Sequence, residues 1–88
     1  MVVKTVRVLN RAGVHARPAA LIVQAASRFD SKIMLVRDTI RVNAKSIMGV
    51  MAMAAGCGSE LELVVEGPDE VAALSAIERL FQNKFEEE

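Results

Sequence analysis

The stretch ELELVVEGPDEVAALSAIERLFQNKF, residues 60–85, decides the fold class of this chain. Residues 60–66 alternate between glutamate and aliphatic side chains, which predicts a strand with one buried and one solvated face. The aliphatic positions are Leu61, Leu63 and Val65. Gly-Pro-Asp-Glu at 67–70 predicts a turn into a helix that starts near Pro68 or Asp69. Apolar residues at spacings of three and four predict its core-facing stripe, namely Val71, Leu74, Ile77, Phe81 and Phe85.

The chain before residue 60 repeats these two kinds of pattern. Val6 and Val8 alternate with polar neighbours and predict a strand, although Lys4 interrupts the alternation. Residues 18–29 carry apolar side chains at helical spacing: Ile22, Ala25, Ala26 and Phe29. Residues 33–36 and 40–42 predict two strands joined by a turn at 37–39. A short helix is predicted from Ile47 to about Met53, stopped by the glycines of 56–58.

The predicted order is therefore βαββαβα in one domain. Alternating strands and helices with one apolar stripe each favour a two-layer α+β fold, in which helices cover one face of an antiparallel sheet. The length of 88 residues and the hydrophobic content of 52% suit a single folded domain. Glutamates at 86–88 predict a short, frayed acidic tail.

Composition excludes several classes of function. Eleven basic residues balance eleven acidic ones, and aromatic residues make up only 3%, so neither the charge nor the stacking groups of a nucleic-acid binder are present. The single Cys57 cannot form an internal disulfide and suits a reducing compartment. The sequence contains no apolar run long enough to predict a signal peptide or a membrane span. We therefore expect a cytoplasmic protein that binds no nucleic acid and no membrane.

His15 is the strongest candidate for chemistry, since it is the only histidine and lies where a strand-like segment gives way to a helix. Pro18 fits a first helical turn, whose unpaired amides and positive dipole end favour an anion. Arg17 adds donors suited to phosphate oxygens, and imidazole is a nucleophile near neutral pH. A lone histidine is more often an ordinary surface or core residue. One histidine and one cysteine cannot supply a four-ligand zinc site, so we expect no metal and no cofactor.

Ser46 is the second candidate. It is a plausible N-cap for the short helix, where an added phosphate would meet the positive dipole end. Capping alone is the simpler interpretation. Ile47, Met48 and Met51 point in different directions on this short helix, so some of them should be exposed, and flexible methionines suit a surface that binds partners.

The two motifs together resemble those of the HPr family, the histidine-containing phosphocarriers of the bacterial phosphoenolpyruvate-dependent sugar phosphotransferase system. GVHARPA at 13–19 looks like that family's phosphorylation motif, and NAKSIMGVM at 43–51 looks like its regulatory serine motif. The resemblance spans essentially the whole chain. It implies a single HPr-like domain over residues 1–88, an open-faced β-sandwich with a four-stranded antiparallel sheet and three helices on one face.

The resemblance also implies a stoichiometric carrier rather than an independent enzyme. His15 would accept a phosphoryl group on Nδ1 from Enzyme I and pass it to Enzyme IIA domains, while Arg17 neutralises it. Ser46 would be the target of the HPr kinase/phosphorylase, and its phosphorylation would slow transfer and allow binding to a transcriptional regulator of carbon catabolite control. Ile47, Met48 and Met51 would be docking residues on a monomer.

Two departures from the family pattern bear on these expectations. Ala12 stands where members often carry a polar residue beside the phosphohistidine, so the backbone amides of Ala16 and Arg17 should matter more. Asp38-Thr39 replaces the frequent Asn-Gly turn. Two other functions stay open: a purely regulatory protein that acts through Ser46, and a small hydrolase that uses His15 as a general base. The sequence shows no nucleophile elbow for the hydrolase.

Overall fold

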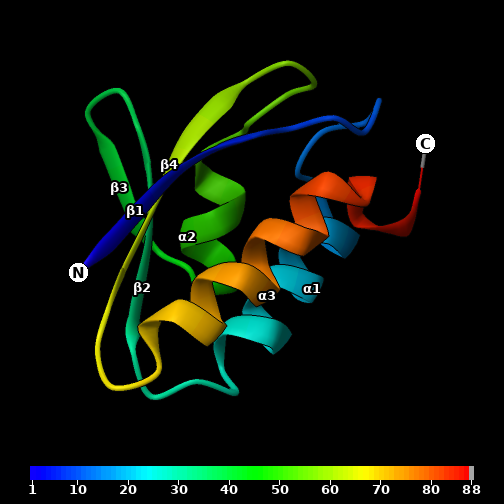
Figure 1. The fold of residues 1–88 in the computed structure, drawn as a ribbon. Helices are drawn as coiled ribbons and strands as arrows, with labels where there is room; N and C mark the ends of the chain where they lie inside the picture. The colour runs from blue at the N-terminus through cyan, green and yellow to red at the C-terminus, as the bar shows by residue number, and fades with distance from the viewer. Residues whose placement is uncertain (88) are drawn as a thin grey trace.

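The computed structural model describes residues 1–87, and its elements follow the predicted order with one extra turn at the end (Figure 1). The elements are β1 (Val2–Arg7), α1 (Ala16–Ala26), β2 (Lys32–Arg37), β3 (Ile40–Asn43), α2 (Ile47–Ala52), β4 (Glu60–Glu66), α3 (Glu70–Gln82) and the 3₁₀ turn η1 (Lys84–Glu86). No helix among these residues is long and apolar enough to cross a membrane.

The four strands form one antiparallel sheet in the order β1-β4-β2-β3. The pattern in residues 60–66 is confirmed, because Leu61, Leu63 and Val65 are buried while their glutamate neighbours Glu60 and Glu62 are exposed. The register places each buried residue of β4 opposite a buried residue on one of its two neighbours. On the β1 side Val6 lies opposite Leu61, and on the β2 side Leu35 lies opposite Leu63 and Ile33 opposite Val65.

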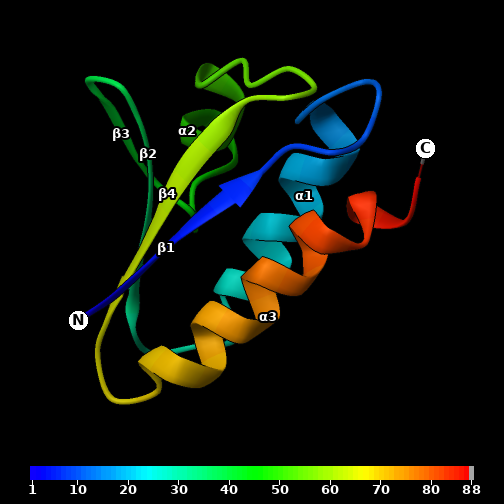
Figure 2. The ribbon, with the colours of Figure 1, turned by 45° about the horizontal axis from the view of Figure 1, so that its top comes forward.

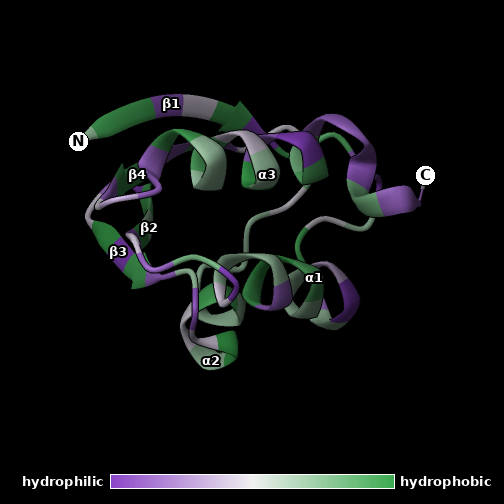
Figure 3. Ribbon diagram, turned by 60° about the horizontal axis from the view of Figure 1, so that its bottom comes forward, coloured by the Kyte–Doolittle hydropathy of each residue, from purple (hydrophilic) through white to green (hydrophobic). Residues whose placement is uncertain are grey.

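The helices cover one face of this sheet, as expected for an open-faced β-sandwich (Figures 1 and 2). Helices α1 and α3 contact each other, and α3 contacts β1 and β4. Fully buried side chains from both helices, including Ile22, Ile77 and Phe81, complete the core between the layers. Helix α2 lies at the border of the helical layer and carries hydrophobic residues there (Figure 3). The predicted fold class is confirmed.

Helix α1 begins two residues earlier than predicted and ends earlier as well. It starts at Ala16, so His15 is its N-cap residue and Pro18 lies in the third helical position. That position is still within the first turn, where the missing N–H of proline leaves no intrahelical hydrogen bond unmade. The expected extension to Phe29 is wrong, because Ser27 is the C-cap of α1 and the next two residues, Arg28 and Phe29, make i→i−3 hydrogen bonds in place of the helical i→i−4 bonds.

Helix α2 and the hairpin between β2 and β3 form as predicted, with local differences. The glycines of 56–58 do not stop α2: it ends at Ala52, and Ala54 adopts a φ of 50° two residues before Gly56. The hairpin turn places the positive φ on Asp38, at 55°, and not on Thr39. Asp tolerates this left-handed conformation better than a β-branched residue does, which explains how the pair replaces Asn-Gly.

Part of the predicted stripe on α3 is wrong. Val71 is 67% exposed, and the buried face is formed by Ala73, Ile77 and Phe81 at intervals of four. Val71 precedes Ile77 by six residues, which at 3.6 residues per turn places it about 120° around the helix. Phe85 is fully buried as predicted, but it belongs to the turn after α3 and not to the helix.

Candidate functional site

His15 lies at the start of α1, where its backbone is fixed as the helix N-cap and its side chain is exposed. Its extended backbone conformation is that of an N-cap, and its carbonyl oxygen accepts the Ala19 N–H at 2.9 Å. The side chain is 44% exposed. The ring makes no side-chain capping bond, so its two nitrogens are available to other partners. A nucleophilic imidazole at a helix N-terminus is therefore presented to solvent, as expected from the sequence.

The loop before His15 is fixed by a close approach of two backbone segments. Gly13 has a φ of 75°, and a Cβ at this position would lie 2.6 Å from the Ala55 carbonyl oxygen. The neighbouring Val14 is buried and donates its N–H to that same oxygen at 2.9 Å. Only glycine permits both the left-handed backbone and the contact. The segment after α2 thus positions the loop that carries His15.

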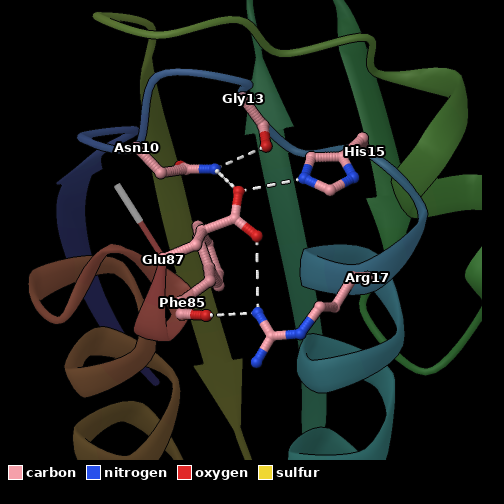
Figure 4. Close-up of polar contacts among 6 residues, drawn as sticks. All are labelled: Asn10, Gly13, His15, Arg17, Phe85 and Glu87. Atoms are coloured by element: carbon pink, nitrogen blue, oxygen red, sulfur yellow. Dashed lines mark hydrogen bonds and ion pairs between the residues drawn. The ribbon is translucent and has the colours of Figure 1, made fainter.

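Arg17 is the second residue of α1, and its side chain points toward Phe85 and Glu87 (Figure 4). Its Nη1 donates to the Phe85 carbonyl oxygen at 2.7 Å and lies 3.4 Å from Oε2 of Glu87. The side chain is half exposed. In residues 1–87, the amide N–H groups of Ala16 and Arg17 have no hydrogen-bond acceptor. One imidazole, one guanidinium and two free amides make a donor set that suits an oxyanion and not a metal cation.

The prediction of a frayed acidic tail is wrong for Glu87. Its carboxylate folds back over the site, where Oε1 lies 2.9 Å from Nε2 of His15 and accepts from Nδ2 of Asn10 at 2.9 Å (Figure 4). The hydrogen bond with His15, followed by that with Asn10, holds the pKa of the Glu87 carboxyl below its ordinary value. Glu86 is exposed, and Glu88 lies outside the described residues. The loop after β1 and the start of α1 therefore converge on one carboxylate.

Asn10 is a site residue that the sequence did not reveal. It is fully buried in the loop after β1, and its Nδ2 donates both to the Gly13 carbonyl oxygen at 2.7 Å and to Glu87. An asparagine in a loop is ordinary, and neither periodicity nor a motif distinguishes this one. The bond between Asn10 and Glu87 joins residues 77 positions apart, which no local pattern can predict.

A strained turn brings Glu87 to the site. Lys84, Phe85 and Glu86 have φ values of 55°, 53° and 61°, so three consecutive residues that are not glycine adopt the left-handed conformation. This conformation costs an L-residue about 1–2 kcal/mol. The Phe85 side chain offsets part of that cost, because it is fully buried and packs edge-to-face on Phe81 with ring centroids 4.9 Å apart. The turn reverses the chain after α3 and returns it to the start of α1.

Ser46 is the N-cap of α2, as predicted: its Oγ accepts the Gly49 N–H at 3.1 Å. The exposed side chains expected beside it are found at Ile47, Met48 and Met51, which are 42%, 78% and 43% exposed. Met53 is buried instead. The structure does not include Ser46 in the cluster of hydrogen bonds around His15. The two candidate sites are linked through the segment after α2, where Ala55 accepts from Val14.

Comparison with known proteins supports one family throughout. The family model described as "PTS HPr component phosphorylation site" matches residues 2–83. The HPr-like protein Crh of Halalkalibacterium halodurans is 52% identical over 77 residues, covering 88% of this chain and 92% of that protein. The phosphocarrier protein HPr of Cupriavidus necator is 42% identical over 87 residues, covering 99% and 98%.

Solved structures agree with the sequence comparison. A crystal structure of HPr-C-His from Thermoanaerobacter tengcongensis superposes with a TM-score of 0.96 at 46% identity, covering 100% of this chain and 99% of that one. A structure of an HPr dimer from the same organism gives a TM-score of 0.78 at 46% identity, covering 97% and 98%. The fold, the family model and the relatives all agree, and this chain belongs to the HPr family of phosphocarriers.

Proposed function

We propose that this chain accepts a phosphoryl group on His15 from phosphorylated Enzyme I and passes it to Enzyme IIA domains during sugar uptake. One observation carries the proposal: His15 is half exposed at the N-terminus of α1, beside Arg17 and two amides with no acceptor in residues 1–87. The chain works as a stoichiometric carrier, because the phosphoryl group leaves with the next protein. Membership of the HPr family supports the assignment of both partners.

The transfer step uses the lone pair of an imidazole nitrogen, which the resemblance to the family identifies as Nδ1. This lone pair attacks phosphorus, the bond from phosphorus to the donor breaks, and its electron pair returns to the donor. The Arg17 guanidinium and the amides of Ala16 and Arg17 hold the oxygens of the phosphoryl group. These donors are accessible to solvent and moderate in number, so the group is held without the excessive ground-state binding that would slow the next transfer.

Enzyme I and labelled phosphoenolpyruvate test the proposal directly. We expect acid-labile label on His15, no label in His15→Ala, and retention of the fold in that variant because the side chain lies outside the core. Arg17→Ala should slow labelling by about tenfold to a hundredfold, since it removes charge-assisted hydrogen bonds worth about 1.5–3 kcal/mol. Label that persists in His15→Ala, or a wild-type chain that takes no label, would overturn the carrier function.

Regulation through Ser46 is a second candidate function, favoured by a specific arrangement. The Ser46 hydroxyl caps α2 beside Ile47, Met48 and Met51, which together form an exposed apolar surface. We propose that the HPr kinase/phosphorylase phosphorylates Ser46 and that the added charge changes which protein docks on this surface. A transcriptional regulator of carbon catabolite control would bind the modified form. A solved structure described as Crh, the catabolite repression HPr of Bacillus subtilis, is 45% identical to this chain, and this similarity supports the candidate.

The kinase with ATP separates the two candidates. Acid-stable label on Ser46 supports the regulatory function, and Ser46→Ala is the matched control that should take none. Ser46→Asp should slow Enzyme I-dependent labelling of His15, because it places negative charge beside the docking residues. A carrier needs His15, whereas a protein that only regulates through Ser46 does not. Unchanged transfer by Ser46→Asp would contradict the electrostatic account.

We also propose that the carrier acts as a monomer. The exposed docking surface on α2 and the half-exposed His15 are both accessible in the single chain. An HPr dimer is known among the similar structures, so the proposal needs its own measurement. Sedimentation at micromolar concentration should give a single species of about 9.5 kDa, the mass of one chain. A species of twice that mass would contradict it.

A further inference from the structure

We propose that Glu87 determines which ring nitrogen of His15 accepts the phosphoryl group. It acts as a positioning residue: its carboxylate engages Nε2 and leaves Nδ1 as the only nucleophilic nitrogen. The inference rests on the proposed function, in which His15 is the phosphoryl acceptor. It assigns a role to a residue from the last turn of the chain that lies outside both sequence motifs.

The proton on Nε2 follows from the contacts of the Glu87 carboxylate. Asn10 donates from Nδ2 to the Gly13 carbonyl oxygen, which fixes the orientation of its amide. The same Nδ2 therefore presents a donor to Oε1 of Glu87, and Arg17 presents another to Oε2. Surrounded by donors, the carboxylate is ionised and can only accept. The contact of 2.9 Å between Oε1 and Nε2 is then a hydrogen bond that Nε2 donates.

A nitrogen that carries a proton has no free in-plane lone pair, so Nε2 cannot attack phosphorus. The neutral ring then keeps its lone pair on Nδ1, for which residues 1–87 offer no hydrogen-bond partner. Glu87 also disfavours reaction at Nε2 by its position, since its negative charge occupies the space that an incoming phosphoryl anion would need. In the reaction the bond from Nδ1 to phosphorus forms, the bond from phosphorus to the donor breaks, and the Nε2 proton stays in its hydrogen bond to Glu87.

The strained turn indicates that the fold holds Glu87 in this position. The chain reaches it through three consecutive left-handed residues, and the central one, Phe85, is anchored by full burial. The Phe85 carbonyl oxygen also accepts from Arg17 at 2.7 Å. Strain of this kind gathers at functional sites, where the surrounding contacts hold it.

Phosphoramidate is the donor of choice for the test, because it has no protein surface that could dictate the reacting nitrogen. Attack by a ring nitrogen forms the new N–P bond while the P–N bond of phosphoramidate breaks, and ammonia leaves with the electron pair. His15 is the only histidine, so ring ¹⁵N labelling gives one unambiguous pair of signals. NMR of that pair reports the tautomer before the reaction and the phosphorylated nitrogen after it.

The wild-type chain should show a protonated Nε2 and form the Nδ1 product. Glu87→Ala should raise the ratio of Nε2 to Nδ1 product by at least about tenfold, because a charged hydrogen bond is lost. Glu87→Gln should raise it as well, since its carboxamide cannot offer acceptors to all three donors. Glu86→Gln is the matched control, an exposed neighbour with no contact to His15, and should behave as wild type.

The two donors distinguish the role of Glu87 from the carrier function. An unchanged product ratio in both Glu87 variants, or a wild-type chain phosphorylated on Nε2, overturns the role of Glu87 even if Enzyme I still labels His15. Reaction at Nδ1 with phosphoramidate but no label from Enzyme I overturns the carrier function and leaves the role of Glu87 standing. A wild-type His15 that takes a phosphoryl group from neither donor overturns both.

Discussion

Replacing Lys84 by glycine should stabilise this protein. Glycine usually destabilises a folded chain, because it loses more backbone freedom on folding than any other residue. Lys84, however, has a φ of 55° in the turn after α3, a conformation that glycine adopts without steric cost. Its side chain is exposed, so the substitution removes no buried contact.

The size of the effect is the difference between two terms. Relief of the left-handed conformation gains about 1–2 kcal/mol. The greater backbone entropy of glycine in the unfolded chain costs about 0.5–1 kcal/mol. The net gain is about 1 kcal/mol in the free energy of unfolding, which corresponds to a rise in Tm of about 4–8 °C for a domain of this size.

Urea unfolding and thermal melting measure this change, and Ala72→Gly is the matched control. Ala72 is exposed on α3, where the backbone is right-handed, so the same change to glycine should cost about 1 kcal/mol. We expect the urea midpoint to rise for Lys84→Gly and fall for Ala72→Gly, with no change in the slope of either transition. If Lys84→Gly lowers the midpoint as Ala72→Gly does, the turn is not strained and the reasoning about it is refuted.

Three further predictions concern the loop before His15, the cap of α2 and the turn before α3. Gly13→Ala should destabilise the fold by about 2 kcal/mol and slow transfer, because left-handed strain adds to a contact of 2.6 Å with the Ala55 carbonyl oxygen; wild-type stability in denaturant would contradict this. Ser46→Ala should cost about 1 kcal/mol through loss of the N-cap, whereas Ser46→Asp should keep most of it; equal Tm values for the two variants would count against the capping role. Hydrogen bonds from Ser31 and from the backbone of Asp30 lower the pKa of the Asp69 carboxyl. The ionised carboxyl therefore stabilises the fold fully above its ordinary pKa of about 4, and this stabilisation is lost as the pH falls through the lowered pKa of the folded state. The free energy of unfolding should fall as the pH is lowered from 6 to 2, and it should fall less in Asp69→Asn. An equal fall in both chains would argue against this role of Asp69.

The sheet could be predicted from the sequence because its signals are local. In β4 the alternation of glutamate with Leu61, Leu63 and Val65 directly records which side chains meet the core. The same reasoning was less exact for α3. Spacings of three and four drift around a helix, so Val71 satisfied the pattern although it lies far from the face of Ile77.

The candidate site could be predicted only as far as its motif extends. His15 and Arg17 adjoin a recognisable helix start, and Ser46 has the chemistry of an N-cap, so each carries a local signal. Asn10 and Glu87 carry none, because their role depends on tertiary contact between the two ends of the chain. A run of glutamates is normally solvated, and only the buried Phe85 beside it indicates that the chain turns back.

The strand order also determines when this protein can acquire its shape during synthesis. The central strand β4 joins β1 to the β2–β3 hairpin, yet it is the last strand to be made. Val6 in β1 therefore cannot pair until its partner Leu61 has been synthesised. While the ribosome is still producing residues before 60, only the hairpin can pair, and β1 has no neighbour. The sheet can therefore be completed only after β4 has been made. Because its contacts join residues that are far apart in the sequence, folding is slower than in a helical bundle of equal size. The site around His15 assembles last, because its final component is residue 87.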